Sequence, residues 1–445
     1  MTRTGFQFAV CSMLAIIPLA LVMTTTRAET PGNSPATATH AATQSHVARV
    51  ANSPAAAAAS LWFRRHEHEL LDSQVELAEI PAPPFGESAR SEWLSERFTA
   101  LGLEDVHIDE IGNVFGIHRG SLPKARFIAL TAHLDTVFPA GTSFSVRRDG
   151  ERIFGPGVSD NAAGVTALLG IAAAMKASNI RTESPVLFIG NVGEEGEGDV
   201  RGMRHIFATP RWRDSIASTM VLDGAGTDTI VTEALGSKRF LVTIHGPGGH
   251  SWSDFGLPNP IMVLSRALEI FRRTPIPTTP KTTFNVGVIS GGTSVNSIPE
   301  SVSMRVDIRS ISAEQVDRLE RALREALESA VREESTFTGL MRNHDIGYEM
   351  KMIGSRPAAR LKSDSHLLST LHAVDGFLGN KARQQRASTD ANIPISLGYE
   401  AFAIGAGGSG GGAHTVSEWY DAAGREIGLK RILLTTLLLA GMSDE

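Results

Sequence analysis

The sequence predicts an α/β fold, in which a mostly parallel sheet with helices on both faces is interrupted by an inserted α+β domain. Three observations indicate this. Short apolar runs alternate with amphipathic segments in residues 61–236, which is typical of parallel strands covered by helices. The order of the elements changes in residues 237–355. The first pattern then returns in residues 356–445.

The amino-terminal segment differs in composition from the rest of the chain. Arg3 precedes an apolar run at residues 6–23, and small residues follow it, so residues 1–28 are predicted to be a signal peptide. An uncleaved membrane anchor is the alternative. Residues 29–60 are rich in Ala, Thr, Ser and Pro and predict a flexible leader, with the folded part beginning near Leu61. We therefore expect a secreted or periplasmic protein.

Composition excludes some classes of function. The chain of 445 residues has a formal net charge of −6 and no basic tract, which argues against nucleic acid as a partner. The single cysteine, Cys11, lies in the apolar run, so the mature chain is expected to form no disulfide.

The elements of the main domain follow from local patterns. An amphipathic helix at 61–80 ends at a run of prolines, and a second helix at 87–101 ends at Gly102. Strands are expected at 106–109, 114–118, 127–130, 186–191 and 219–222, and an Ala-rich helix at 162–177. Residues 193–202 form a polar, glycine-rich loop. Near the carboxyl end, a helix at 365–377, a strand at 401–404 and a helix at 427–440 complete the domain.

The inserted domain has a different order of elements. Strand, helix, strand, strand, helix and strand are expected at 239–245, 259–273, 283–289, 301–308, 313–333 and 348–353. That β-α-β-β-α-β order is the ferredoxin-like, split-βαβ arrangement.

Residues able to bind metal recur where the predicted strands of the main domain end. His133 and Asp135 follow the strand at 127–130 and, with a side-chain period of two, lie on the same side of its carboxyl end. The others are Asp160, Glu194, Glu195, Asp223 and His414. Histidines and carboxylates without a thiolate are the ligands of a catalytic zinc pair rather than a structural zinc. Taken singly, Asp160 could instead cap the following helix and Asp223 could be a turn residue.

The adjacent glutamates, Glu194 and Glu195, suggest two different roles in catalysis. A two-metal hydrolase needs one carboxylate as a ligand and another, unligated, to move a proton from the attacking water to the leaving amine. The alternative is a solvated acidic loop, because Glu197 and Asp199 are close by in the sequence.

In these motifs the chain resembles the co-catalytic dizinc peptidases and amidohydrolases, which include glutamate carboxypeptidase, tripeptide aminopeptidase, acetylornithine deacetylase and succinyl-diaminopimelate desuccinylase. The family's H-x-D, G-x-x-D and E-E-x-G motifs stand here at residues 133–135, 157–160 and 194–198. The resemblance implies that Asp135 supports His133, that Asp160 bridges two metals and that Glu194 is the general base. It also implies that the metal ligands are His133, Asp160, Glu195, Asp223 and His414.

The resemblance implies further roles. His250, in a glycine-rich turn of the inserted domain, would stabilise the oxyanion, usually in the partner subunit's site. The expected substrate contacts are Asn296, Arg356, Arg309, Asp390 and Asn392, with Arg356 receiving the substrate carboxylate; Arg309 could equally be a surface ion pair. The glycine run at 405–412 is denser than the family usually shows, which leaves the path to His414 open.

The expected function is that of a secreted zinc exopeptidase hydrolysing short peptides, similar to tripeptide aminopeptidase, with two zinc ions per subunit (cobalt or manganese as alternatives). The resemblance implies an aminopeptidase or dipeptidase, since within that family aspartate at the position of Asp223 accompanies these activities. An N-acyl amino acid deacylase or desuccinylase, a carboxypeptidase and a non-catalytic peptide-binding relative are the alternatives. The resemblance also implies a homodimer formed through the inserted lid domain.

Overall fold

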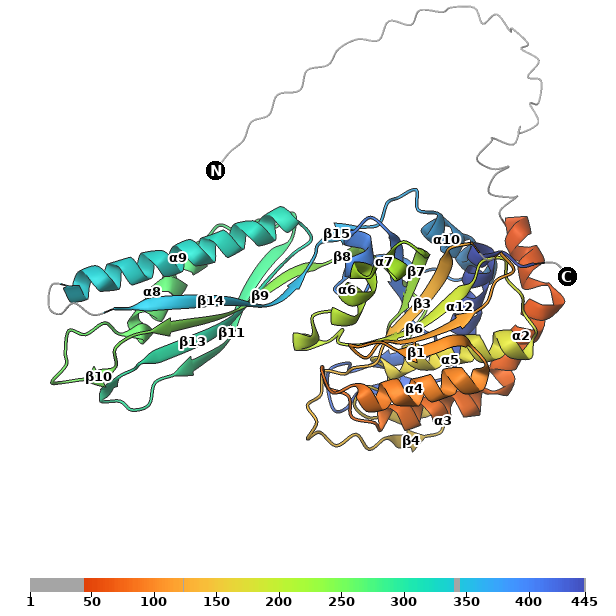
Figure 1. Cartoon of the computed structure of the whole chain (residues 1–445), viewed down its shortest axis with the longest axis horizontal. Coiled ribbons are helices and arrows are strands. Elements are labelled where there is room, and N and C mark those ends of the chain that lie inside the picture. Colours follow the sequence, from red (N-terminus) through yellow and green to blue (C-terminus); the bar gives the residue numbers. More distant parts are fainter. Residues whose placement is uncertain (1–43, 123, 340–344, 444–445) are drawn as a thin grey trace, which may run out of the picture. The chain divides into compact units, whose positions relative to one another are not determined.

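The computed structural model describes residues 44–122, 124–339 and 345–443, and a nine-stranded sheet lies at the centre of the main domain (Figure 1). The strands follow the order β1-β2-β6-β3-β7-β17-β8-β15, and β16 also pairs with β8. Their bounds are β1 Glu104–Ile108, β2 Val114–His118, β6 Val186–Asn191, β3 Phe127–His133, β7 Ile216–Leu222, β17 Glu400–Ile404, β8 Thr229–Ala234, β15 Ala359–Arg360 and β16 Arg383–Ala387.

The central strands of this sheet are parallel and its edges are largely antiparallel. β3 pairs in parallel with both β6 and β7, and β7 pairs in parallel with β17. His133 stands beside Asn191, and Leu222 beside Ile404, so the carboxyl ends of these strands meet at one edge. The prediction of a mostly parallel sheet is confirmed. The strands β8, β15 and β16 had not been predicted.

Helices cover both faces of the sheet. Alternate residues of β3 separate the two cores, since Ile128 and Leu130 pack in one core and Ala129 in the other. The first core includes residues of α2 Pro54–Arg65, α3 Glu67–Ala78, α4 Ser88–Leu101, α5 Ala162–Ala177, α10 His366–Leu378 and α12 Arg425–Ala440. The second includes residues of α6 Arg201–Ala208, α7 Pro210–Arg213 and α11 Asn392–Ser396.

The expectation of a flexible leader up to residue 60 is wrong for its last part. Residues 44–50 are helical, and α2 begins at Pro54 after the side chain of Ser53 has capped the backbone N–H of Ala56. Ala56, Ala59 and Phe63 of α2 are fully buried. An alanine run resembles low-complexity sequence, but alanine is also the best helix former and fits closely against a core. The predicted signal peptide lies outside the described residues.

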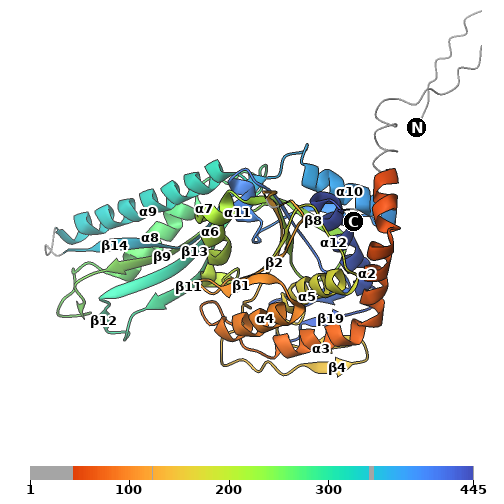
Figure 2. The same cartoon turned by 45° about the vertical axis from the view of Figure 1, so that its right-hand side comes forward.

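The inserted domain has the predicted order of elements and its own core. Its strands are β9 Gly236–His245, β11 Thr282–Gly291, β13 Ser301–Ser310 and β14 Gly347–Arg356, in the order β11-β13-β9-β14 with every pair antiparallel. The helices α8 Pro260–Arg272 and α9 Ala313–Gly339 lie on one face of this sheet (Figure 2). A two-stranded ladder of β10 Gly249–His250 and β12 Ser297–Ile298 had not been predicted.

A second small sheet stands next to the expected ligands Asp160 and His414 in the sequence. It contains β4 Arg147–Asp149, β5 Arg152–Phe154, β18 Ser409–Gly411 and β19 Trp419–Asp421. The sequence patterns of these strands are too short to predict. In the part of the chain that the structure describes, no helix is long and apolar enough to cross a membrane.

Candidate metal centre

The five expected ligands lie together at the carboxyl edge of the central strands. Nε2 of His133, at the end of β3, lies 3.1 Å from Oδ1 of Asp160 and 3.8 Å from Oδ1 of Asp223. Nε2 of His414 lies 2.9 Å from Oε1 of Glu195 and 3.2 Å from Oδ2 of Asp160. The ligand atoms form two groups of three, each within 4.8 Å, and Asp160 belongs to both. A carboxylate shared in this way fits a bridge between two ions.

The electrostatics of the five side chains fit a cationic occupant. Burial lowers the pKa of His133, but the neighbouring carboxylates of Asp135, Asp160 and Asp223 outweigh it and raise that pKa well above its ordinary value. Hydrogen bonds to Asp160 and Glu195 raise the pKa of His414 to about 10. Both shifts show that the carboxylates create a strongly negative potential where positive charge is stabilised. Divalent ions held by imidazole and carboxylate would use the same potential.

Asp135 orients the glutamate loop. It is fully buried, and its two carboxylate oxygens accept the backbone N–H groups of Glu194 at 2.9 Å and Glu195 at 2.7 Å. Nδ1 of His133 lies nearer to the backbone oxygen of Asp135, at 3.1 Å, than to its carboxylate, at 3.6 Å. The expected pairing of His133 with Asp135 is therefore made largely by the backbone, while the carboxylate holds the loop.

Two residues that sequence reasoning missed fix the ligands in place. Glu418, fully buried, accepts the backbone N–H groups of Gly157 at 3.0 Å and of Ser159 and Asp160 at 2.7 Å. Asn161 caps α5 and donates to the backbone oxygen of Leu222 at 2.9 Å, which ties the Asp160 loop to the strand before Asp223. Glu418 stands only four residues after His414, and that proximity was the one available signal.

The glycine run at residues 405–412 leads to His414 at the candidate metal centre and packs closely against a neighbouring loop. Asp223 and Gly226 donate backbone hydrogen bonds to Ile404 and Gly407, so the run lies directly against the loop after β7. A side chain at Gly405 would overlap the backbone oxygens of Ala225 and Gly226. The density of glycine thus follows from close contact between two backbones.

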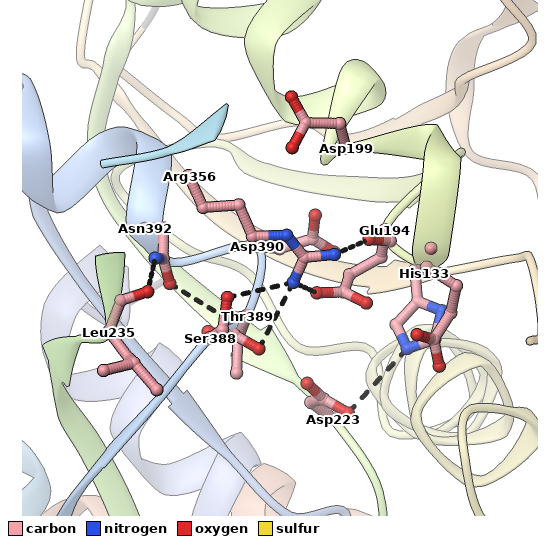
Figure 3. A network of polar contacts seen from close by, with 12 residues as sticks. His133, Glu194, Asp199, Asp223, Leu235, Arg356, Ser388, Thr389, Asp390 and Asn392 are labelled. Atoms are coloured by element: carbon pink, nitrogen blue, oxygen red, sulfur yellow. Dashed lines mark hydrogen bonds and ion pairs between the residues drawn. The ribbon is translucent and has the colours of Figure 1, made fainter. Parts of the chain in front are cut away.

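Glu194 is buried beside the ligands but belongs to neither group of three. Burial raises the pKa of Glu194 well above its ordinary value, and the charge of Arg356 opposes that shift. Its Oε1 accepts a hydrogen bond from Nη1 of Arg356 at 2.7 Å (Figure 3).

Three of the expected substrate contacts are buried and bind other groups of their own chain. Arg356 is 6% exposed and is engaged by Glu194, not free to receive a carboxylate. Asp390 is fully buried and accepts from Nδ2 of Asn191 at 2.6 Å. Asn392 is also buried, and its amide joins Leu235, Pro357 and Thr389. All three therefore lie in the interior, Arg356 at the end of β14, Asp390 against Asn191 of β6, and Asn392 at the start of α11 against Leu235.

The remaining candidates lie in the inserted domain. His250 and Asn296 are brought together, since His250 pairs with Ser297 and Ser251 donates to the backbone oxygen of Asn296. His250 is exposed, and Nδ1 of its ring accepts the backbone N–H groups of Trp252 and Ser253 in its own turn. Arg309 forms an ion pair with Asp307 at 2.7 Å on a partly exposed surface, which agrees with the alternative of a surface ion pair.

Comparison with known proteins identifies the family. A model of peptidase family M20/M25/M40 matches residues 129–437, a range that contains all five expected ligands. An uncharacterized protein of Bacillus subtilis is 25% identical over 280 residues, covering 60% of this chain and 72% of that protein. A probable carboxypeptidase of Uncinocarpus reesii is 26% identical over 303 residues, covering 60% of this chain and 66% of that protein.

The fold agrees with that of a solved tripeptidase from Staphylococcus aureus, with a TM-score of 0.68 at 20% identity over 84% of this chain and 98% of that chain. The resemblance seen in the motifs is thus confirmed over most of the sequence. The chain is a metallo-hydrolase that acts on peptide or amide bonds and belongs to peptidase family M20/M25/M40.

Proposed function

We propose that the protein is a two-metal exopeptidase that removes single amino acids from short peptides. One observation carries this proposal: two groups of three ligands share Asp160, and the buried Glu194 lies beside them without belonging to either. Five possible ligands with one shared carboxylate would suit two ions better than a single ion.

The chain offers His133 and Asp223 to one ion, Glu195 and His414 to the other, and Asp160 to both. Imidazole and carboxylate ligands without thiolate favour zinc, with cobalt or manganese as alternatives. Two ions held there would supply Lewis acidity, which polarises a scissile carbonyl and makes an attacking water more acidic. The Asp135 and Glu418 carboxylates hold the backbone of both ligand loops, which keeps the donor atoms in one geometry.

Glu194 moves the proton. Its carboxylate takes a proton from the attacking water and delivers it to the nitrogen of the leaving amine, so that the residue ends the cycle in its starting state. Burial of the carboxyl group, which raises its pKa, suits a base that must also act as an acid.

Glu194→Gln tests this role. The variant should lose about 10²–10⁴ in kcat and keep both metal ions, because the amide cannot accept the proton and ligation is untouched. Glu195→Gln should lose metal as well as activity. Glu197→Gln, an exposed glutamate of the same loop paired with Arg305, is the matched control and should behave as wild type. Near-normal turnover by Glu194→Gln would show that another group is the base.

Asp223 supports short peptides as the substrate class. In the family that the chain resembles, aspartate at this position accompanies aminopeptidases and dipeptidases. The likeness to a probable carboxypeptidase favours the alternative that the enzyme requires a free carboxyl terminus instead. A screen of the metal-loaded protein against free di- and tripeptides, their N-acetylated forms and their C-terminal amides separates these activities. Cleavage of only the N-acetylated substrates would show that the enzyme is an N-acyl amino acid deacylase and not an exopeptidase.

We also propose that His250 donates a hydrogen bond to the oxyanion in a partner subunit. Its Nδ1 accepts the backbone N–H groups of Trp252 at 3.2 Å and Ser253 at 3.4 Å, which leaves the proton on the exposed Nε2. Loss of such a donor typically reduces kcat by about 10²–10³. Support for the homodimer comes from the family resemblance and from this exposure.

Mixed refolding of Glu194→Ala and His250→Ala chains tests the arrangement. Random pairing in a dimer should restore roughly a quarter of wild-type activity if the histidine acts on its partner's site, because one site in each mixed dimer is complete. No recovery, or a monomer under assay conditions, contradicts it. Secretion or periplasmic location remains a proposal based on residues 1–28, and amino-terminal sequencing of the exported protein would test it.

A further inference from the structure

Arg356 reaches from the inserted domain to the proposed base. It is the last residue of β14, and its guanidinium holds Glu194 at two points: Nη1 donates to the carboxylate at 2.7 Å, and Nη2 donates to the backbone oxygen of the same residue. Nη1 also lies 3.1 Å from Oγ of Ser388 (Figure 3). A planar fork that binds the side chain and the main chain of one residue limits both its rotamer and its backbone.

Asp390 places a second buried carboxyl group near this arginine, and burial raises the pKa of that group to about 7. The carboxylate is fully buried, and Asn191 of β6 donates to its Oδ2 at 2.6 Å, while Asn191 in turn accepts from Thr131 of β3 at 2.5 Å. Within the described part of the chain, Oδ1 of Asp390 and Nε of Arg356 are both buried and make no hydrogen bond. When Asp390 is ionised, these two groups carry opposite charges and stabilise each other in a poorly hydrated interior.

The charges and the burial oppose the expected role of Arg356 in binding the substrate carboxylate. The guanidinium is 6% exposed and faces two carboxylates of its own chain. A substrate carboxylate would have to displace Glu194 from it, which would disable the base during binding.

We propose that Arg356 is a positioning residue that holds Glu194 at the metal centre, and that Asp390 balances its charge and keeps it in place. This inference rests on the proposed role of Glu194. The inference concerns the ion pair between Arg356, at the end of the last strand of the inserted domain, and Glu194, in the loop after β6.

Kinetics of Arg356→Met with paired substrates test the proposal. A tripeptide and its C-terminal amide should both lose about 10²-fold in kcat with KM nearly unchanged, because a misplaced base slows the chemical step without weakening binding. Arg356→Lys should recover part of kcat, and added guanidinium ion should partly rescue Arg356→Met. A rise in KM confined to the tripeptide would return Arg356 to the role of carboxylate receptor and overturn the proposal.

Arg305→Met is the matched control, since Arg305 of β13 lies in the same sheet and forms an exposed ion pair with Glu197 at 2.8 Å. It should leave kcat and KM unchanged. Asp390→Asn, which keeps the shape of the side chain and its oxygen toward Asn191, should lower kcat less than Arg356→Met does, again with KM unchanged. This variant covers the case in which Arg356→Met does not fold. Unchanged kcat in Asp390→Asn contradicts its part of the proposal.

A measurement without turnover completes the test. In metal-free protein, the denaturation midpoints of Arg356→Met, Glu194→Gln and the double variant should be strongly non-additive, because the two side chains interact directly. Additive midpoints would overturn the inference. Inactive Glu194→Gln combined with a normal kcat in Arg356→Met would refute this inference alone, whereas active Glu194→Gln would refute the proposed base.

Discussion

Glu418→Gln should weaken metal binding although Glu418 is not an expected ligand. The carboxylate receives three backbone N–H groups, with Ser159 and Asp160 on one oxygen and Gly157 on the other. Glutamine retains one oxygen for the first two groups and must turn its NH₂ toward the N–H of Gly157. The substitution thus changes the support of the Asp160 loop without changing the size of the side chain.

The magnitude follows from these hydrogen bonds. An orphaned buried donor at Gly157 costs about 1–3 kcal/mol, and the two remaining bonds each lose about 1 kcal/mol when their acceptor becomes neutral. Relief of the buried charge offsets part of this loss, since burial raises the pKa of Glu418 to about 7. A net loss of about 1–3 kcal/mol remains, which corresponds to a reduction in metal affinity of roughly 10–100-fold.

The assay is competition with a chromogenic chelator at about pH 8, where the wild-type carboxyl is ionised in the folded protein. Glu400→Gln is the control, because Glu400 accepts the N–H groups of His366 and Leu367 at 2.9 Å at the start of α10, away from the ligands. The control should lose stability but not metal. Metal affinity of Glu418→Gln within about twofold of wild type would refute the argument that this carboxylate holds Asp160 in place.

Two further predictions concern stability. Glu67, 3.3 Å from Arg425, has its pKa raised to about 7 chiefly by burial, so its stabilising contribution is present below its unfolded pKa and is lost as the pH rises through about 7. The free energy of unfolding of Glu67→Gln relative to wild type, measured with denaturant, should therefore rise by about 1–2 kcal/mol between about pH 5 and pH 8. A difference in free energy that does not change with pH would contradict this. Phe63→Ala should lower the free energy of unfolding by about 3–5 kcal/mol because Phe63 is fully buried, whereas the exposed Phe255→Ala should change it little. A small effect of Phe63→Ala would mean that α2 adds little to the fold.

Much of the candidate site was predictable because its signals are local. His133, Glu195 and Asp223 each follow an apolar run that forms a strand, and parallel strands bring their carboxyl ends to one edge. The inserted domain was predictable for the same reason, since each of its six main elements has its own periodicity. The alanine-rich start of the fold was misjudged because composition alone does not show whether a helix has a core to pack against.

What the sequence by itself determined is the set of residue types at strand ends and the order of the elements that carry them. Only the tertiary structure decided which buried charges meet. Arg356 pairs with Glu194 across 162 positions, and Glu418 supports the Asp160 loop across 258. No local pattern encodes such pairs. They form because loops from distant segments pack on one sheet edge, where every buried charge must find a partner among the groups that the fold brings within reach.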